Sequence, residues 1–158
     1  MSHDIFKKKN QLTHTLDNVS KYPDLIASCA GGKKSLSCFE ENITFCIKYI
    51  SSWLNGSAIL IYNNRLEDLS SFEISRAQIW QWRRHKILLE GGEVVNDELL
   101  NSCLEKSFEH CHREIQSSIS NKEIMLGQEE ILKKAFDLTK TLITCPEMPN
   151  YFTEFIEL

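Results

Sequence analysis

One amphipathic segment constrains the fold of this chain most strongly. Between residues 37 and 56, apolar side chains recur at steps of three and four: Phe39, Ile43, Cys46, Ile47, Ile50, Trp53 and Leu54. This spacing places them on one face of a helix. Ser37 and Glu40 stand three apart, as in a capping box, and predict where the helix begins, while Asn55-Gly56 predicts its end. The fold must therefore bury one face of a long helix.

Most of the other segments also carry helical patterns. Helices are expected over about 4–19, 67–85, 96–115, 128–144 and 150–156. The apolar run from Ala58 to Tyr62 predicts a buried extended segment or a buried turn, and Asn63-Asn64 indicates a turn after it. Gly91-Gly92 lies between apolar pairs and favours a hairpin. The expected core includes Phe39, Ile43, Ile50, Trp53, Ile79 and Trp80.

Together these patterns predict a mainly α fold. We expect about five helices with one short extended segment or hairpin, in a single domain over 1–158 whose residues 1–36 form an opening helix and loop. A TIM barrel typically needs about 250 residues. The chain has 158 residues and its patterns are too helical for eight strands, so no TIM barrel is expected in it.

Composition excludes several classes of function. The formal net charge of −4 gives no overall basic field that would hold nucleic acid or an anionic membrane. The longest apolar runs are far shorter than the roughly 20 residues of a membrane span, and the first ten residues are too polar for a signal peptide. The six cysteines form no CxxC pair. We therefore expect a soluble cytoplasmic protein with reduced, mostly buried thiols.

Two clusters invite a binding function and also have a simpler explanation. Zinc prefers the ligand types of Cys103, His110, Cys111 and His112, but neighbours on a helix point about a hundred degrees apart, which favours core thiols beside surface histidines. The basic run 83–86 follows Trp80 and Trp82 and could bind nucleic acid or a phosphorylated ligand. Cations at the last turn of a helix explain the same run more simply.

The acidic pair Glu67-Asp68 lies where a loop becomes a helix. Acidic side chains at this position interact favourably with the helix dipole, and nothing in the spacing alone makes Asp68 a base. The residues that follow are more specific. The string EISRAQIWQW, residues 73–82, together with Trp53-Leu54 and Leu66-Glu67-Asp68, resembles the C-terminal region of malate synthase. The similarity runs from about residue 10 to the end of the chain.

The resemblance implies a chemical role for the acidic pair. Malate synthases condense acetyl-CoA with glyoxylate on a (β/α)₈ barrel, and a helical C-terminal domain closes the barrel mouth. That domain supplies the aspartate that removes a proton from the acetyl methyl group. By its position, Asp68 would be this catalytic base, with Glu67 and Arg76 as supporting residues. Such a base needs proximity to the substrate, partial desolvation and an electrophile that stabilises the enolate.

The same resemblance implies that this chain is inactive alone. In the family the barrel holds Mg²⁺ and the stabilising arginine, so Mg²⁺ and acyl-CoA are expected only with a TIM-barrel partner, a malate-synthase-like or citrate-lyase-like subunit. No metal or cofactor is expected on this chain alone, and no nucleic acid or membrane as partner. One interpretation is a split enzyme that condenses acetyl-CoA, or another acyl-CoA, with glyoxylate or a similar oxo acid. The alternative is a non-catalytic interaction or regulatory module, or a truncated remnant of malate synthase.

Overall fold

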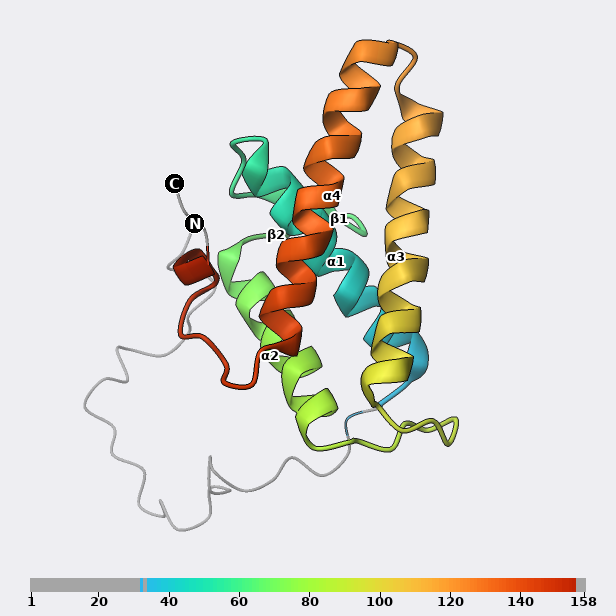
Figure 1. Ribbon diagram of the computed structural model, residues 1–158, viewed down its shortest axis with the longest axis vertical. Helices are drawn as coiled ribbons and strands as arrows, with labels where there is room; N and C mark the ends of the chain where they lie inside the picture. The colour runs from blue at the N-terminus through green and yellow to red at the C-terminus, as the bar shows by residue number, and fades with distance from the viewer. Residues whose placement is uncertain (1–31, 33, 156–158) are drawn as a thin grey trace, which may run out of the picture. The chain divides into compact units, whose positions relative to one another are not determined.

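The computed structural model describes residues 32 and 34–155, and these form a helical unit with one small hairpin (Figure 1). The elements in chain order are α1 (Leu36–Leu54), β1 (Leu60–Tyr62), β2 (Arg65–Glu67), α2 (Leu69–Arg84), α3 (Asp97–Ser118), α4 (Lys122–Thr144) and the 3₁₀ helix η3 (Phe152–Phe155). The mainly α prediction is confirmed, and the described residues contain no barrel. The helix expected over 4–19 lies outside the described residues.

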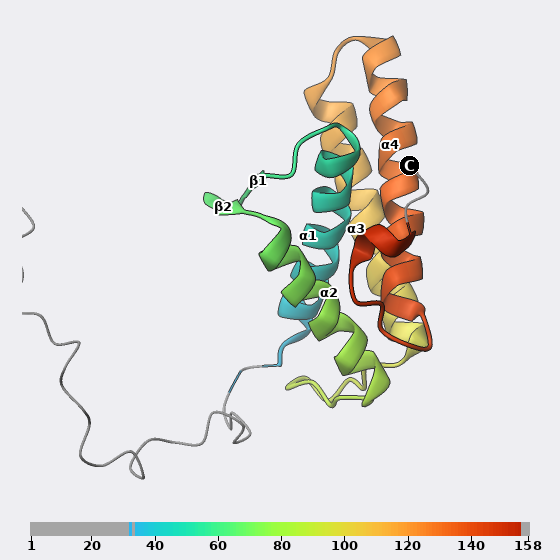
Figure 2. The same cartoon turned by 90° about the vertical axis from the view of Figure 1, so that its left-hand side faces the viewer.

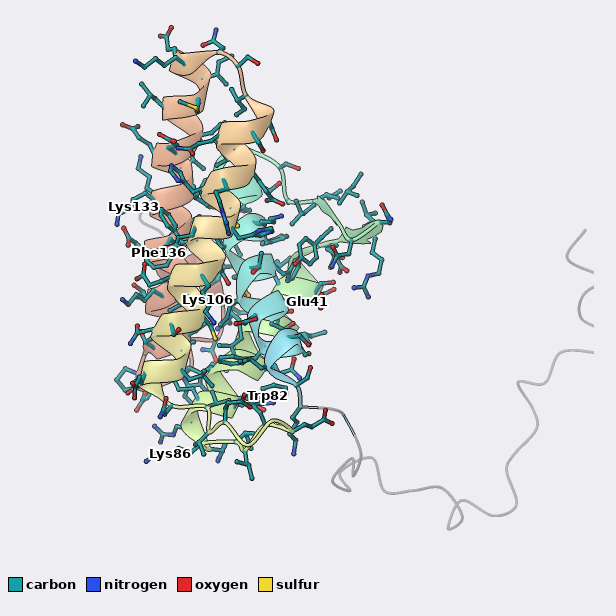
Figure 3. All side chains as sticks on the ribbon, turned by 90° about the vertical axis from the view of Figure 1, so that its right-hand side faces the viewer. Glu41, Trp82, Lys86, Lys106, Lys133 and Phe136 are labelled. Carbon is teal, nitrogen blue, oxygen red and sulfur yellow. The ribbon has the colours of Figure 1, made fainter. Side chains whose placement is uncertain are left out.

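Helix α1 begins two residues earlier than the capping-box pattern predicted. The hydroxyl of Ser35 accepts a hydrogen bond from the backbone N–H of Cys38 at 3.2 Å, which makes Ser35 the N-cap. Glu40 does not turn back to the cap, since its carboxylate lies 3.4 Å from the ammonium of Lys106 on α3. Figure 3 labels Lys106. The predicted end is confirmed: Asn55 is the C-cap, and Gly56 has a φ of +87°, which favours glycine.

Helix α1 is the central element of the core. It packs against α2, α3 and α4, and its buried side chains are Phe39, Ile43, Phe45, Cys46, Ile47, Tyr49 and Ile50. Of the predicted core residues, Phe39, Ile43, Ile50 and Ile79 are fully buried. Trp53 and Trp80 are only half-buried. All five cysteines in the described region are free, and Cys46, Cys103 and Cys111 are buried.

The segment after α1 is extended, as predicted, but much of it is exposed. Strands β1 and β2 pair antiparallel, with Ile61 opposite Leu66, and the hairpin projects from the helices (Figure 2). Asn63 and Asn64 have φ values of +50° and +60°, as the tight hairpin turn requires. Ile61 is 75% exposed, so the expected burial of this run is wrong. Since Glu67 belongs to β2, α2 begins two residues later than predicted.

The C-terminal half also differs in its boundaries. Asn121 caps α4 by accepting hydrogen bonds from Glu123 and Ile124, so this helix begins before the predicted residue 128. The helix predicted over 150–156 is a single 3₁₀ turn, η3. Gly92 has a φ of +92°, and a bridge joins Leu88 to Val94, so the hairpin-like turn predicted there is present. Among the helices described, none is long and apolar enough to cross a membrane.

Truncation of Trp53 should measure how much this half-buried indole stabilises the unit. Its ring contacts Phe152 edge-on, with the ring centroids 5.4 Å apart. We expect Trp53→Ala to lower the free energy of unfolding by about 3 kcal/mol, at the lower end of the range for large aromatic residues. Urea denaturation measures this value. Tyr151→Ala, at a side chain that is 64% exposed, is the control and should change stability little; equal effects would show that Trp53 adds no core packing.

Candidate functional site

The carboxylate of Asp68 caps the N-terminus of α2. Its Oδ1 accepts hydrogen bonds from the backbone N–H of Ser70 at 2.9 Å, the hydroxyl of Ser70 at 2.6 Å and the backbone N–H of Ser71 at 3.3 Å. The hydrogen bonds from the Ser70 hydroxyl and the Ser71 N–H lower the pKa of Asp68 below its ordinary value. The side chain is therefore held ionised and oriented in a defined direction.

One oxygen of this carboxylate stays available. All the hydrogen bonds that the Asp68 side chain accepts within the described part of the chain go to Oδ1, and the residue is exposed. Oδ2 thus faces solvent without a partner from these residues. An ionised carboxylate with one fixed and one free oxygen can accept a proton from a group that approaches from outside the domain.

Several exposed apolar side chains lie near Asp68, in the hairpin and at the start of α2. Ile61 and Leu66 are opposite each other in the hairpin and are 75% and 72% exposed. Side chains alternate between the two faces of a strand, so Asp68, two residues after Leu66, continues on this same face. Ile59 and Leu69 are also exposed beside it. We call Ile59, Ile61, Leu66 and Leu69 the hairpin face.

Glu67 points to the opposite side of the hairpin. Its side chain is 18% exposed and lies 3.6 Å from the guanidinium of Arg65. It lines a cavity of about 190 Å³ between the hairpin, α1 and α2, together with Glu41 and Ser75. The two predicted acids are therefore neighbours in sequence but face different surroundings, with Glu67 half-buried under the hairpin and Asp68 exposed on it.

Arg76, the other predicted supporting residue, faces the C-terminal segment. Its side chain is 2% exposed and forms an ion pair with Glu73. Its Nη2 donates hydrogen bonds to the backbone carbonyls of Pro149 at 3.0 Å and Asn150 at 3.2 Å. The structure thus brings Arg76 into contact with the C-terminal segment. Any support that Arg76 gives to Asp68 acts through the packing of α2.

Two aromatic residues behind the hairpin were not predicted as part of the site. The rings of Tyr49 and Phe72 stack with centroids 4.9 Å apart, and the hydroxyl of Tyr49 donates to the carbonyl of Ala58 at 3.1 Å. Tyr49 therefore holds the chain just before β1, while Phe72 holds the first turn of α2. Phe72 follows Asp68 by one helical turn, which was the only signal in the sequence.

The cysteine and histidine cluster shows no arrangement for a metal. His112 Nε2 lies 2.8 Å from Glu129, and His110 lies 3.4 Å from Glu114. Burial raises the pKa of the Cys103 and Cys111 thiols to about 11, so neither is an available thiolate. Across residues 34–155, no three histidine, cysteine, aspartate or glutamate side chains gather closely enough to bind a metal ion.

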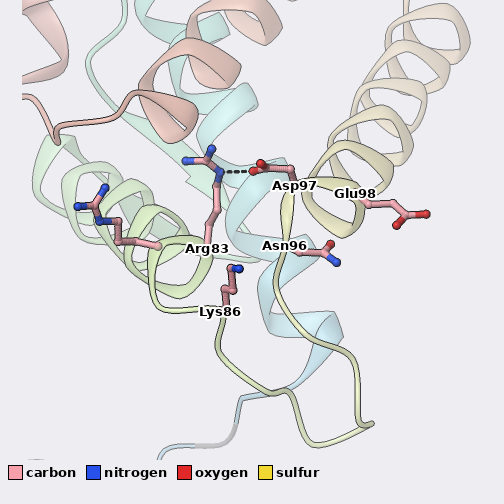
Figure 4. A pocket seen from close by; sticks show the side chains of 6 residues that line it. Arg83, Lys86, Asn96, Asp97 and Glu98 are labelled. Carbon is pink, nitrogen blue, oxygen red and sulfur yellow. Dashed lines mark hydrogen bonds and ion pairs between the residues drawn. The ribbon is translucent and has the colours of Figure 1, made fainter.

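The basic run at the end of α2 is largely used within the fold. Arg83 donates to Asp97 at 2.5 Å (Figure 4) and to the carbonyl of Thr144 at 3.2 Å. Arg84 donates to the carbonyl of Pro146 at 3.3 Å and lies over the ring of Trp80. Both arginines occupy the last turn of the helix. The helix-end interpretation therefore accounts for these contacts.

Fold and site together define a class: a helical accessory domain that exposes a helix-capping aspartate on an apolar hairpin. The family model described as "Malate synthase, C-terminal" matches residues 33–156. This chain belongs to the malate synthase C-terminal family. The predicted resemblance is thereby confirmed.

The relatives that the chain matches are longer proteins. It is 46% identical to a malate synthase of Dictyostelium discoideum over 115 residues, which cover 73% of this chain and 19% of the relative. It is 27% identical to malate synthase A of Escherichia coli, over 92% of this chain and 26% of the relative. A bifunctional glyoxylate cycle protein of Caenorhabditis elegans is 28% identical, over 92% of this chain and 14% of the relative. The chain thus spans about a quarter or less of these relatives.

Proposed function

We propose that this chain presents Asp68 as the general base of an acyl-CoA condensation, on a barrel that a separate chain provides. In the proposed reaction, Asp68 removes a proton from the carbon next to the thioester of acetyl-CoA or another acyl-CoA. The resulting enolate attacks the aldehyde or ketone carbon of glyoxylate or a similar oxo acid, and the carbonyl oxygen takes up a proton as the new carbon–carbon bond forms. Water then hydrolyses the thioester and releases coenzyme A with a free thiol. Glu67 and Arg76 act as supporting residues that do not touch the substrate.

One observation supports this proposal above the others. An ionised aspartate, exposed and with one free oxygen, lies on the hairpin face, where Ile61 and Leu66 are both more than two-thirds exposed. Groups of exposed apolar side chains on one face are a feature of surfaces that bind a protein partner. A barrel seated on the hairpin face would bring its substrate to Asp68 directly.

Docking would also make Asp68 a better base. In the free chain, hydrogen bonds to Oδ1 keep its pKa low, and a carboxylate of low pKa accepts protons weakly. Covering the hairpin face would remove water from around the carboxylate, and desolvation raises the pKa of an acid. The base would therefore gain strength only in the assembly, where the substrate is present.

The remaining groups have to come from the partner. Among the described residues, no three histidine, cysteine, aspartate or glutamate side chains gather to hold a metal ion. By the family resemblance, Mg²⁺ and the enolate-stabilising arginine are assigned to the proposed barrel subunit, which is malate-synthase-like or citrate-lyase-like. The bound metal would polarise the oxo acid. Acyl-CoA is expected to bind only in the assembly, and the proposed location of the assembly is the cytoplasm.

A second candidate function is a non-catalytic interaction module or a remnant of malate synthase. It is favoured by the hydrogen bonds of Asp68, which satisfy the first turn of α2 and so give the residue a structural reason to be there. Both proposals use the hairpin face for binding. They differ in whether the bound partner is a barrel with a metal site.

Charge on the hairpin face should prevent binding of the barrel partner. We expect affinity purification of the tagged chain from its native host to retain a barrel chain of the malate synthase type, identified by mass spectrometry. Leu66→Lys should lose it, because a lysine would be buried in an apolar contact. Leu88→Lys is the matched control: Leu88 is 62% exposed but lies beyond the other end of α2.

Recovery of a partner that lacks a barrel would favour the interaction module. If a barrel chain is retained equally by the Leu66→Lys variant, the hairpin face is not its binding surface. In that case the proposed approach of substrate to Asp68 would be wrong.

A further inference from the structure

A stripe of polar side chains on α2 binds the backbone of the C-terminal segment. Glu73, Arg76, Trp80 and Arg83 are spaced by three or four residues and so share one face of the helix. Trp80 donates from its indole N–H to the carbonyl of Cys145 at 2.8 Å, and Arg83 donates to that of Thr144. We call these four residues the clasp, because they hold residues 144–152. Three of them belong to the string EISRAQIWQW.

Phe152 anchors the far end of this segment. Its side chain is 2% exposed, and its ring contacts Trp53 and Phe72 edge-on, with centroid distances of 5.4 Å and 5.1 Å. Its backbone N–H donates to Oε1 of Glu73 at 3.2 Å, while Oε2 of Glu73 accepts from Nε of Arg76 at 2.6 Å. Glu73 therefore joins Arg76 to the anchor residue.

The anchor lies directly behind the N-terminus of α2. Phe72 is the first buried residue of this helix, and its backbone N–H donates to the carbonyl of Asp68 at 3.2 Å. Leu69 and Ser70 are exposed. Phe72 therefore fixes the first turn, and the rings it contacts are those of Tyr49 and Phe152. Removing Phe152 takes away one of these two supports.

From these contacts we infer that Phe152, held by Glu73 and Arg76 of the clasp, is a positioning residue for Asp68. The C-terminal segment acts through Phe72, which carries the constraint to the first turn of α2 and so to the aspartate. Tyr49 stacks on Phe72 and donates to the carbonyl of Ala58, so the same aromatic packing contacts the chain before β1 and after β2. The catalytic consequence depends on the proposed function, whereas the positioning itself does not.

Carboxyl ¹³C NMR titration of Asp68 in the full chain tests the positioning without a partner. Loosening the first turn should weaken the hydrogen bonds to Oδ1, so Phe152→Ala should raise the pKa of Asp68 toward its ordinary value of 3.8. Phe152→Leu, which keeps an apolar anchor, should shift it less and serves if the alanine variant does not fold. An unchanged pKa in folded Phe152→Ala, or in Phe152→Leu where only that variant folds, would overturn the inference.

Phe136→Ala is the matched control for general loosening. Phe136 is 6% exposed and packs against Phe108 of α3, with ring centroids 5.0 Å apart, and it does not belong to the clasp (Figure 3). It should lower stability as other buried aromatic truncations do and leave the pKa of Asp68 unchanged. An equal pKa shift in both alanine variants would show that Phe152 has only a general structural role.

A second readout applies once a catalytic assembly is reconstituted. Misplacement of a reacting group by about 1 Å can cost 10²-fold, so Phe152→Ala should lower kcat by up to about 10²-fold with little change in KM for acyl-CoA. A matching rise in KM, or an unchanged kcat, would contradict positioning. If the wild-type assembly shows no turnover, the proposed function fails while the titration still decides the inference.

Discussion

Replacement of Asp68 by asparagine should lower kcat of the reconstituted assembly by about 10⁴-fold, the upper end of what a positioned general base contributes. Removal of a proton from carbon next to a thioester is difficult without a base, which is why we expect the largest loss. Asparagine caps helices about as well as aspartate, so the fold and the complex should be retained. The rate is measured as the release of coenzyme A, whose free thiol appears when the thioester of the condensation product is hydrolysed.

Glu67→Gln is the matched control for this prediction. Its carboxylate lies under the hairpin and beside Arg65, not on the hairpin face, so it should cost much less. The wild-type chain alone, with Mg²⁺, acetyl-CoA and glyoxylate, should show no turnover because the barrel groups are missing. If Asp68→Asn left the rate intact, or Glu67→Gln abolished it instead, the assignment of the base would be wrong.

The parts of the fold that the sequence predicted are those that depend on local rules. The three- and four-residue spacing gave the buried face of α1, and Asn63-Asn64 and Gly56 marked backbone with positive φ. The start of α1 was missed because Ser35 and Ser37 are both suitable caps, and only the structure shows which hydroxyl meets a free N–H.

The hairpin shows that an apolar run in the sequence is not always buried by the rest of its own chain. Leu60 and Ile61 belong to one apolar run, yet Leu60 is half-buried and Ile61 is exposed, since neighbours on a strand face opposite sides. Covering an apolar side chain is favourable, but the sequence does not say whether the same chain or another molecule covers it. On our proposal, a second chain covers the outer side.

The candidate site was predictable only in part. Asp68 was assigned from the family resemblance, and its place at the start of a helix was expected from the chain itself. The surroundings of Arg76 could not be predicted, because the carbonyls of Pro149 and Asn150 that it contacts lie 73 and 74 residues further along the chain. Contacts at such separation depend on tertiary packing, and no local pattern reports them.

Removal of the Arg76 side chain should cause a large loss of stability. Its guanidinium is almost fully buried and joins Glu73 to the C-terminal segment, so Arg76→Ala would leave Oε2 of Glu73 and two backbone carbonyls without this donor. Breaking a fully buried ion pair from one side typically costs about 3–5 kcal/mol. Because the Glu73 side chain is 23% exposed and still accepts from the Phe152 N–H, the loss here should lie near the lower end, about 3 kcal/mol. We expect a decrease of that size in the free energy of unfolding, measured with urea.

Arg84→Ala is the matched control for Arg76→Ala. Arg84 belongs to the same helix and also donates to a backbone carbonyl of the C-terminal segment, but its side chain is exposed. Water can replace that exposed contact, so the loss should stay within about 0.5 kcal/mol. Arg76→Met keeps most of the buried volume, and it should recover only the packing part of the loss, because Glu73 still lacks its charged partner. If Arg76→Ala and Arg84→Ala were equally stable, the buried guanidinium of Arg76 would contribute nothing to holding the C-terminal segment. Arg76→Met would then be as stable as Arg76→Ala.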